Sequence, residues 1–339
     1  MMLGKMKQWV LIVLLVLVVG LTACQNGEES TDDTTSTDNT EQQESEENTS
    51  DENDDDNSEA SEESESTFPV TITDRTDQEI TIEEKPESIV SVIPSATEIV
   101  YAVGAGDAVD GVSQWADYPK EVNDVETVGD MNLNIEKIVS LEPDLVVADV
   151  QNADDIDAMR DAGLNVLVIG SQSLDAVYRD IEMVGQATGH MDQAKDIVSD
   201  MRSRVSDVKD AVSDIPEEER KRVWVEVGPQ LFSGAQGSFL HEILTLAGGL
   251  NIIGDQEGWP QVSEEVIIEQ NPDVIITTYG ETTENAHEKI MNRDGWDTIT
   301  AVQEEAIYDM KNNLLSRPGP RLVDGLEELA RILYPNEMN

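Results

Sequence analysis

The side chains that could do chemistry in this chain are abundant carboxylates, three histidines and a single cysteine. His190, His241 and His287 form no recognisable metal-binding pattern, and there is no nucleophile elbow, phosphate-binding loop or dinucleotide fingerprint. With 72 Asp and Glu residues in the chain, two carboxylates close in sequence carry no information about acid–base catalysis. We therefore expect no catalytic residue, no metal and no cofactor, and the protein is not expected to be an enzyme.

A binding site is a better interpretation, because polar and aromatic residues follow several predicted strands. Ligands of parallel sheets lie beyond the carboxyl ends of the strands, where loops meet helix N-termini. Trp115 and Trp259 would each offer a flat apolar wall with one N–H donor, which suits a large planar ligand, although either could instead be ordinary core. The predicted ligand-binding residues are Ser95, Trp115, Met131, Asn132, Ser233, Trp259, Tyr279, Asn313, Leu314, Leu315, Ser316 and Arg317.

Two arginines near the C-terminus are notable in a chain with only 21 Lys and Arg. Arg317 and Arg321 could hold amide carbonyls, a phosphate or a catecholate, because the guanidinium group offers paired donors. The alternative is an internal ion pair with Asp309 or Asp324. We expect Arg321 to be a structural residue of the last helix.

An internal repeat supplies the framework for these loops. Residues 134–147 and 263–276 are nearly copies of each other: a capped amphipathic helix, a Pro-Asp turn and a short aliphatic strand. Glu136 and Glu265 hold the same place in the first turn of the two helices. The repeat predicts two similar lobes, each offering one acidic residue from an equivalent surface.

The rest of the pattern alternates strands and helices, which implies mainly parallel sheets. Residues 68–82 predict an edge hairpin, and Ser95 with Glu98 has the spacing of a capping box for a helix that ends at Gly104. Residues 239–248 echo that helix, with Glu242 at the position of Glu98. The other predicted strands are 88–92, 109–112, 144–148, 165–169 and 222–227, and the other helices are 153–162, 174–188 and 191–213.

The predicted fold class is therefore α/β, with two Rossmann-like lobes joined by one long backbone helix. The expected domains are an N-terminal lobe over 68–189, the linking helix over 190–215 and a C-terminal lobe over 216–339. A single helical connection would resist hinge closure, so we expect only small motion on binding.

The first 67 residues are not expected to belong to the fold. Residues 1–23 predict a signal peptide, since an apolar run from Trp9 to Val19 follows two lysines and is too short to span a bilayer. Leu-Thr-Ala before Cys24 resembles a bacterial lipobox, so Cys24 is the predicted lipidation site. An ordinary cleaved signal with an incidental cysteine is the alternative. Residues 24–67 predict a disordered acidic tether that acts as a spacer.

The charge of the folded part excludes some partners. Of the 72 acidic and 21 basic residues, 18 acidic ones lie in residues 25–67 and two basic ones precede them, which leaves a formal net charge of −35. Such a surface argues against nucleic acid or an anionic lipid as the ligand. It also suggests a high-salt or alkaline habitat, where ions screen the self-repulsion.

Residues 86–335 resemble the periplasmic-type binding proteins of vitamin B12 and ferric-siderophore ABC importers. The resemblance is carried by six segments in the right order, of which Asp117-Tyr118-Pro119 and the segment around Trp259 are closest to the vitamin B12 branch. The six are 93–99, 111–119, 128–136, 232–234, 259–265 and 317–321.

The resemblance implies a lipid-anchored receptor that captures cobalamin or a related corrinoid and delivers it to a permease dimer with a separate ATPase. It implies that Trp115 and residues 313–317 contact the corrinoid, and that Glu136 and Glu265 each dock against one permease subunit. The alternative role for both glutamates is favourable interaction with the helix dipole.

A ferric-siderophore or haem receptor is the alternative function, and an adhesion or scaffold module without a small ligand is a different class. We expect a monomer on the outer face of the cytoplasmic membrane, as on a Gram-positive cell surface, attached to it through the lipid alone.

Overall fold

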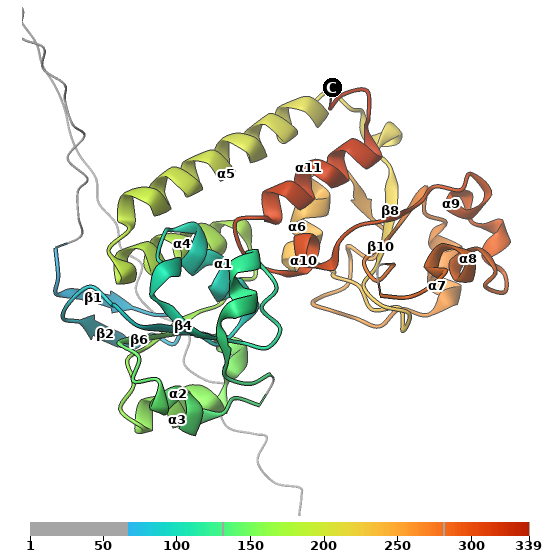
Figure 1. The fold of residues 1–339 in the computed structure, drawn as a ribbon. Helices are drawn as coiled ribbons and strands as arrows, with labels where there is room; N and C mark the ends of the chain where they lie inside the picture. Colours follow the sequence, from blue (N-terminus) through green and yellow to red (C-terminus); the bar gives the residue numbers. More distant parts are fainter. Residues whose placement is uncertain (1–66, 131, 281, 339) are drawn as a thin grey trace, which may run out of the picture. The chain divides into compact units, whose positions relative to one another are not determined.

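The computed structural model describes residues 67–130, 132–280 and 282–338, which belong to one compact unit. The predicted signal peptide, Cys24, almost all of the tether and Met131 lie outside the described residues. Within them, the chain forms two α/β lobes (Figure 1). The predicted fold class is confirmed: all strand pairs in the two main sheets are parallel.

The N-terminal lobe is built on a five-stranded sheet in the order β5-β4-β3-β6-β7. Its chain order is β3 (Ile89–Ser91), α1 (Pro94–Ala102), β4 (Val109–Val112), β5 (Glu126–Thr127), α2 (Ile135–Ser140), β6 (Leu145–Asp149), α3 (Asp154–Asp161), β7 (Val166–Ile169) and α4 (Leu174–Thr188). The predicted hairpin precedes it as the antiparallel pair β1 (Val70–Thr73) and β2 (Glu79–Ile82).

The C-terminal lobe carries a four-stranded sheet in the order β11-β10-β8-β9. After α5 (Met191–Val212) its chain order is β8 (Arg222–Glu226), α6 (Phe239–Leu246), β9 (Leu250–Asn251), α7 (Glu264–Gln270), β10 (Val274–Thr277), α8 (Ala286–Met291), α9 (Thr300–Gln303), β11 (Ile307–Asp309), α10 (Asn312–Ser316) and α11 (Leu322–Leu333).

The two sheets have the same topology, as the repeat predicts. When β5 is left out, the first strand of each sheet lies between the second and the third, and the fourth strand pairs with the third, so that β4-β3-β6-β7 matches β9-β8-β10-β11. The extra strand β5 is added beyond β4. By this matching, α1 corresponds to α6 and α2 to α7.

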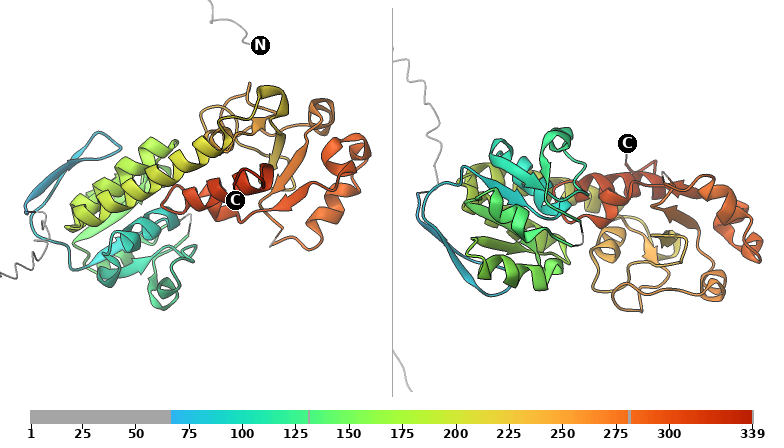
Figure 2. Two further views of the ribbon diagram at one scale, coloured as in Figure 1. Left: turned by 90° about the horizontal axis from the view of Figure 1, so that it is seen from above. Right: turned by 60° about the horizontal axis from the view of Figure 1, so that its bottom comes forward.

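The helix α5 joins the lobes and shares in the core of both. It has 22 residues without Gly or Pro, so it extends for roughly 33 Å at 1.5 Å per residue. Its buried apolar residues, among them Val198, Met201, Val208 and Val212, belong to a single cluster that also includes residues of α4 and α11. Figure 2 shows α5 lying along both α4 and α11.

Each sheet has a second apolar face with a core of its own. In the N-terminal lobe that core includes Ile138 of α2 and Met159 of α3. In the C-terminal lobe it includes Ile267 of α7 and Ile290 of α8. Each lobe is therefore a three-layer arrangement, with the shared core on one side of the sheet and a separate core on the other.

Candidate functional site

The loop after β4 places an aromatic side chain in solvent at the carboxyl end of the N-terminal sheet. The Trp115 side chain is 58% exposed, and its backbone N–H donates to the Ser113 hydroxyl at 3.3 Å. Gln114 N–H donates to the Gly129 carbonyl at 2.8 Å, which ties this loop to the loop of residues 128–134. Gly129 has φ +129°, and a Cβ there would lie 2.6 Å from the Asn132 carbonyl, so this turn needs glycine.

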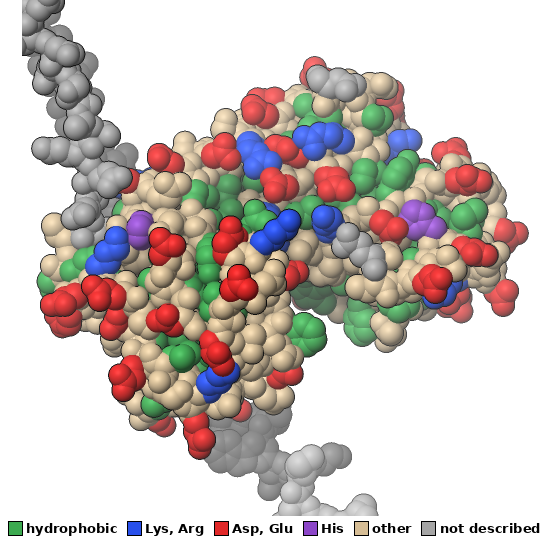
Figure 3. All heavy atoms as spheres, in the orientation of Figure 1, with side chains coloured by type: hydrophobic (Ala, Val, Ile, Leu, Met, Phe, Trp, Pro, Cys, Tyr) green, Lys and Arg blue, Asp and Glu red, His purple; other side chains and the backbone are tan. Residues whose placement is uncertain are grey.

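The C-terminal lobe presents a matching pair of aromatic side chains. Trp259 is 38% exposed and packs edge-on against Phe239, with ring centroids 5.5 Å apart. Phe232, which is 43% exposed, pairs with Gln261 in a short antiparallel bridge, so its loop and the Trp259 loop lie together. In Figure 3 the surface is hollowed between the two lobes, and apolar side chains lie on both sides of the hollow.

Several predicted ligand-binding residues are buried in this structure. Ser95 lies in the first turn of α1, and Leu314 and Leu315 lie in α10. Tyr279, which follows β10, is also buried. Asn132 is exposed, Ser233 is buried, and Asn313 and Ser316 are half-buried. The structure does not test these residues as ligand contacts, so they stay predictions.

Tyr279 belongs to a buried polar cluster under the loops. Its hydroxyl donates to Glu226, and Arg293 donates to both oxygens of the same carboxylate at 2.6 and 2.7 Å. The Trp224 indole N–H also donates to Glu226, at 3.1 Å. Burial first, and then Glu226, raises the pKa of the Tyr279 phenol.

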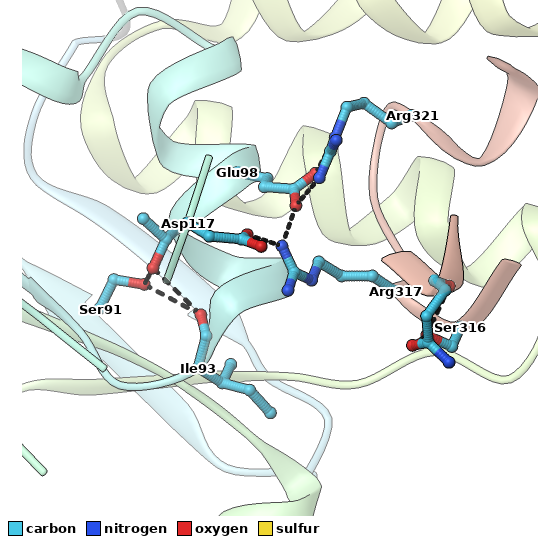
Figure 4. Close-up of polar contacts among 9 residues, drawn as sticks. Ser91, Ile93, Glu98, Asp117, Ser316, Arg317 and Arg321 are labelled. Carbon is cyan, nitrogen blue, oxygen red and sulfur yellow. Dashed lines mark hydrogen bonds and ion pairs between the residues drawn. The ribbon is translucent and has the colours of Figure 1, made fainter. Parts of the chain in front are cut away.

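Across the lobes, four charged residues form what we call the interlobe ion cluster: Glu98, Asp117, Arg317 and Arg321 (Figure 4). Arg321 donates to both oxygens of Glu98, at 2.5 and 2.8 Å. Nη1 of Arg317 donates to Glu98 at 2.7 Å and to Asp117 at 2.5 Å. The hydrogen bonds with Glu98 raise the pKa of Arg321 above its ordinary value, so this guanidinium group keeps its positive charge.

One prediction about this region is wrong, and one alternative holds with other partners. Glu98 is not part of a capping box: α1 begins at Pro94, Ile93 is its N-cap, and no side chain caps it. Arg317 does form internal ion pairs, but with Glu98 and Asp117 rather than with Asp309 or Asp324. Arg321 is structural, as expected, and its guanidinium also lies 3.9 Å from the ring centroid of Tyr118.

Near the predicted binding loops, sequence reasoning overlooked the exposed aromatic residues Phe232 and Tyr118, of which Tyr118 is 45% exposed. Both lie within the six segments that carry the family resemblance. Their place in those segments was the one signal that could have marked them as candidate ligand contacts. Their local sequence pattern does not distinguish an exposed aromatic side chain from one in the core.

The two glutamates of the repeat occupy equivalent places. Asn134 accepts a hydrogen bond at the start of α2 and Ser263 does so at the start of α7, and Glu136 and Glu265 are the second residues of those helices. Both are exposed. A hydrogen bond from its own backbone N–H, and then one from the Ser263 hydroxyl, lower the pKa of Glu265.

The described residues contain neither a candidate metal centre nor a candidate membrane-spanning helix. In residues 67–130, 132–280 and 282–338, no three His, Cys, Asp or Glu side chains are grouped so that they could hold a metal ion. In the same ranges, no helix combines the length and the apolar character needed to cross a bilayer.

The chain is similar to known proteins over most of its length. The family model described as "Periplasmic binding protein" matches residues 89–314. An uncharacterised ABC transporter substrate-binding lipoprotein of Bacillus subtilis is 44% identical over 276 residues, which cover 79% of this chain and 87% of that one.

Two of the solved structures that this chain resembles illustrate the similarity of fold. A possible iron-binding (periplasmic solute-binding) protein of Staphylococcus epidermidis has a TM-score of 0.66 and 33% identity, covering 74% of this chain and 100% of that one. The periplasmic vitamin B12 binding protein of Vibrio cholerae has a TM-score of 0.63 and 29% identity, covering 73% and 96%.

The Tyr279 cluster predicts a pH dependence of stability. An unfolded tyrosine ionises near its ordinary pKa of 10.0, whereas folded Tyr279 keeps its proton to a higher pH. Above about pH 10 the folded state binds more protons than the unfolded state. The stability that is present below about pH 10 is therefore lost progressively as the pH rises toward the folded pKa of Tyr279. Between about pH 9 and about pH 11, the urea midpoint of the wild type should fall more steeply than that of Tyr279→Phe. Parallel pH profiles for the two proteins would contradict this assignment.

Proposed function

The chain belongs to the periplasmic binding protein family and is the substrate-binding protein of an ABC transporter, not an enzyme; on that premise we propose that its ligand is cobalamin or a related corrinoid. The proposal depends on one observation: aromatic side chains of both lobes are exposed, while Arg317 and Arg321 are already paired with carboxylates. The solved protein most directly in support is the vitamin B12 binding protein of Vibrio cholerae.

The aromatic faces suit a large planar ligand. Trp115 comes from one lobe, and Trp259 and Phe232 come from the other, and all three are more than a third exposed. Side chains of this size are seldom left in solvent in a group unless they contact a partner. A corrin ring, flanked by its lower ligand, offers broad apolar surfaces of the matching kind.

The same loops carry several neutral side-chain amides. A corrinoid carries primary amides around its ring, and side-chain amides can both donate to and accept from them. The side-chain oxygen of Asn313 is buried and, among the described residues, receives no hydrogen bond, so α10 holds an unsatisfied acceptor next to these loops. Exposed amides of these loops include Gln114, Asn132, Gln151, Gln230, Gln261 and Asn312.

An iron-carrying ligand is the second candidate. The Staphylococcus epidermidis protein of similar structure is described as a possible iron-binding protein. Lys311, which is exposed directly after β11 and Met310, is a cation that could approach an anionic ferric siderophore or a haem propionate.

Titration with cyanocobalamin, followed by tryptophan fluorescence, tests the ligand. We expect saturable quenching, and Trp115→Ala should weaken binding by about tenfold or more, because a stacking aromatic side chain contributes on the order of 1–3 kcal/mol. Met291→Ala removes a comparably exposed apolar side chain from α8 and should leave the affinity unchanged. Absence of any response to cyanocobalamin, with tight binding of a ferric siderophore, would reverse the order of the two candidates.

We also propose that Glu136 and Glu265 are the contacts with the permease. Two lobes with matching topology present one exposed carboxylate each, at the same position of the matching helices α2 and α7. A permease made of two similar subunits could meet this arrangement with one basic group per subunit. Opposed charges of this kind set orientation and encounter rate more than affinity.

The double variant Glu136→Ala with Glu265→Ala should therefore bind ligand normally and fail to support uptake. Its matched control is Asp161→Ala with Glu269→Ala, which removes one exposed carboxylate per lobe from α3 and α7. Uptake assayed in cells expressing each variant separates the two. Undiminished transport by the first variant would eliminate the docking role.

Finally, we propose that Cys24 carries the lipid that holds the protein at the outer face of the cytoplasmic membrane. Supporting this, a relative with 44% identity is named as a lipoprotein. Two or more acyl chains would anchor the protein stably, whereas one would not.

Cys24→Ser should abolish incorporation of labelled palmitate and shift the protein out of the membrane fraction. Wild-type protein expressed in the same cells is the reference. Membrane association that survives the substitution would show that another segment anchors the chain.

A further inference from the structure

The interlobe ion cluster is balanced in charge. Its two carboxylates, Glu98 and Asp117, come from the N-terminal lobe, and its two guanidinium groups, Arg317 and Arg321, come from the segment around α10 and α11. The Glu98 side chain is 2% exposed and contacts both arginines. Burying it without these partners would be costly, so the pairing is strongly favoured.

The position of the cluster matters, because it joins two of the loops that would hold a ligand. Asp117 lies two residues after Trp115, and Arg317 directly follows α10. The Asp117–Arg317 contact of 2.5 Å therefore links the aromatic loop of one lobe to the α10 loop of the other. A ligand between these loops lies close to Arg317 and to the carboxylates that surround it.

The geometry at Arg317 distinguishes neutral from anionic ligands. Both of its ion-pair contacts leave from Nη1, so the edge formed by Nε and Nη2 is not used by them. A neutral carbonyl can accept a hydrogen bond from that edge. A carboxylate, phosphate or catecholate would gain the same bond but would also meet the negative charge of Glu98 and Asp117.

We propose that Glu98, together with Asp117, is a specificity-determining residue: by neutralising Arg317 and Arg321 it removes the positive charge that an anionic ligand needs, and so matches the site to an uncharged one. The proposal rests on the binding site described under Proposed function and extends it to the class of ligand that the site rejects. Glu98 acts through the arginines and is not itself a ligand contact.

The repeat provides a matched control for Glu98. Glu242 occupies the equivalent position in α6 and also reaches the other lobe, where its carboxylate accepts from the Leu174 N–H at the start of α4 at 2.9 Å. That contact involves a helix N-terminus instead of an arginine. Glu242→Gln therefore disturbs an interlobe contact of the same kind without freeing a guanidinium group.

The experiment compares wild type, Glu98→Gln with Asp117→Asn, and Glu242→Gln. Each is titrated with cyanocobalamin and with the trianionic ferric complex of a tricatecholate siderophore, at the same ionic strength. The double variant should bind the ferric complex on the order of ten- to a hundredfold more tightly than wild type, as expected for one charge-assisted hydrogen bond. Glu242→Gln should show no such gain.

A third substitution assigns the gain to the arginine. Adding Arg317→Gln to the double variant should abolish the new affinity for the ferric complex. Asp117→Asn alone changes an exposed side chain, so it tests the idea without removing the buried carboxylate, and a smaller gain is expected. No gain in either Asp117→Asn or the double variant would overturn the proposal, as would equally tight binding of the ferric complex by wild type.

The outcomes also separate this inference from the corrinoid proposal. If wild type ignores cyanocobalamin but the double variant gains affinity for the ferric complex, the corrinoid proposal fails and the role of Glu98 stands. If wild type binds cyanocobalamin and the double variant gains nothing, the role of Glu98 fails and the corrinoid proposal stands.

Discussion

A carboxylate almost removed from water is the constraint on which the site depends. Glu98 lies on α1 of the N-terminal lobe, and the two arginines that compensate its charge come from the other lobe. Desolvation makes an unpaired charge at this depth expensive, so the segment that carries Arg317 and Arg321 must approach α1. The loops that follow β4 and β11 are thereby brought to face each other.

The duplicated topology explains why the contact lies where it does. In each lobe the helix after the first strand carries a glutamate, Glu98 or Glu242, that crosses to the start of the other lobe's last long helix. Glu98 accepts hydrogen bonds from arginine side chains, whereas Glu242 accepts one from a backbone N–H of α4. The same fold element has thus been given two different partners. The contact of Glu98 with charged arginines lies beside the loop of Trp115. The contact of Glu242 with an uncharged backbone N–H lies at α4.

Much of the fold could be predicted from the sequence, because periodicity and repeats are local signals. Helix α4 has the bounds predicted for it, and α5 ends one residue earlier than predicted. The role of Glu98 could not be predicted, since its partners are 219 and 223 residues away and the local spacing with Ser95 favoured a cap. For Arg317 the nearby carboxylates were considered and the distant ones were not. Long-range pairing of charges is a property of the assembled lobes, and an acidic chain offers too many partners for sequence to choose among them.

The apolar cluster that runs from the hairpin through α5 to Tyr334 has a consequence for how the protein matures. Neither lobe can complete its interior alone, because residues of α5 and α11 close the same cluster that α1 and α4 line. The two halves should therefore gain and lose their structure as one cooperative unit. A half-synthesised or clipped molecule would therefore not persist as a folded lobe able to compete for the transporter.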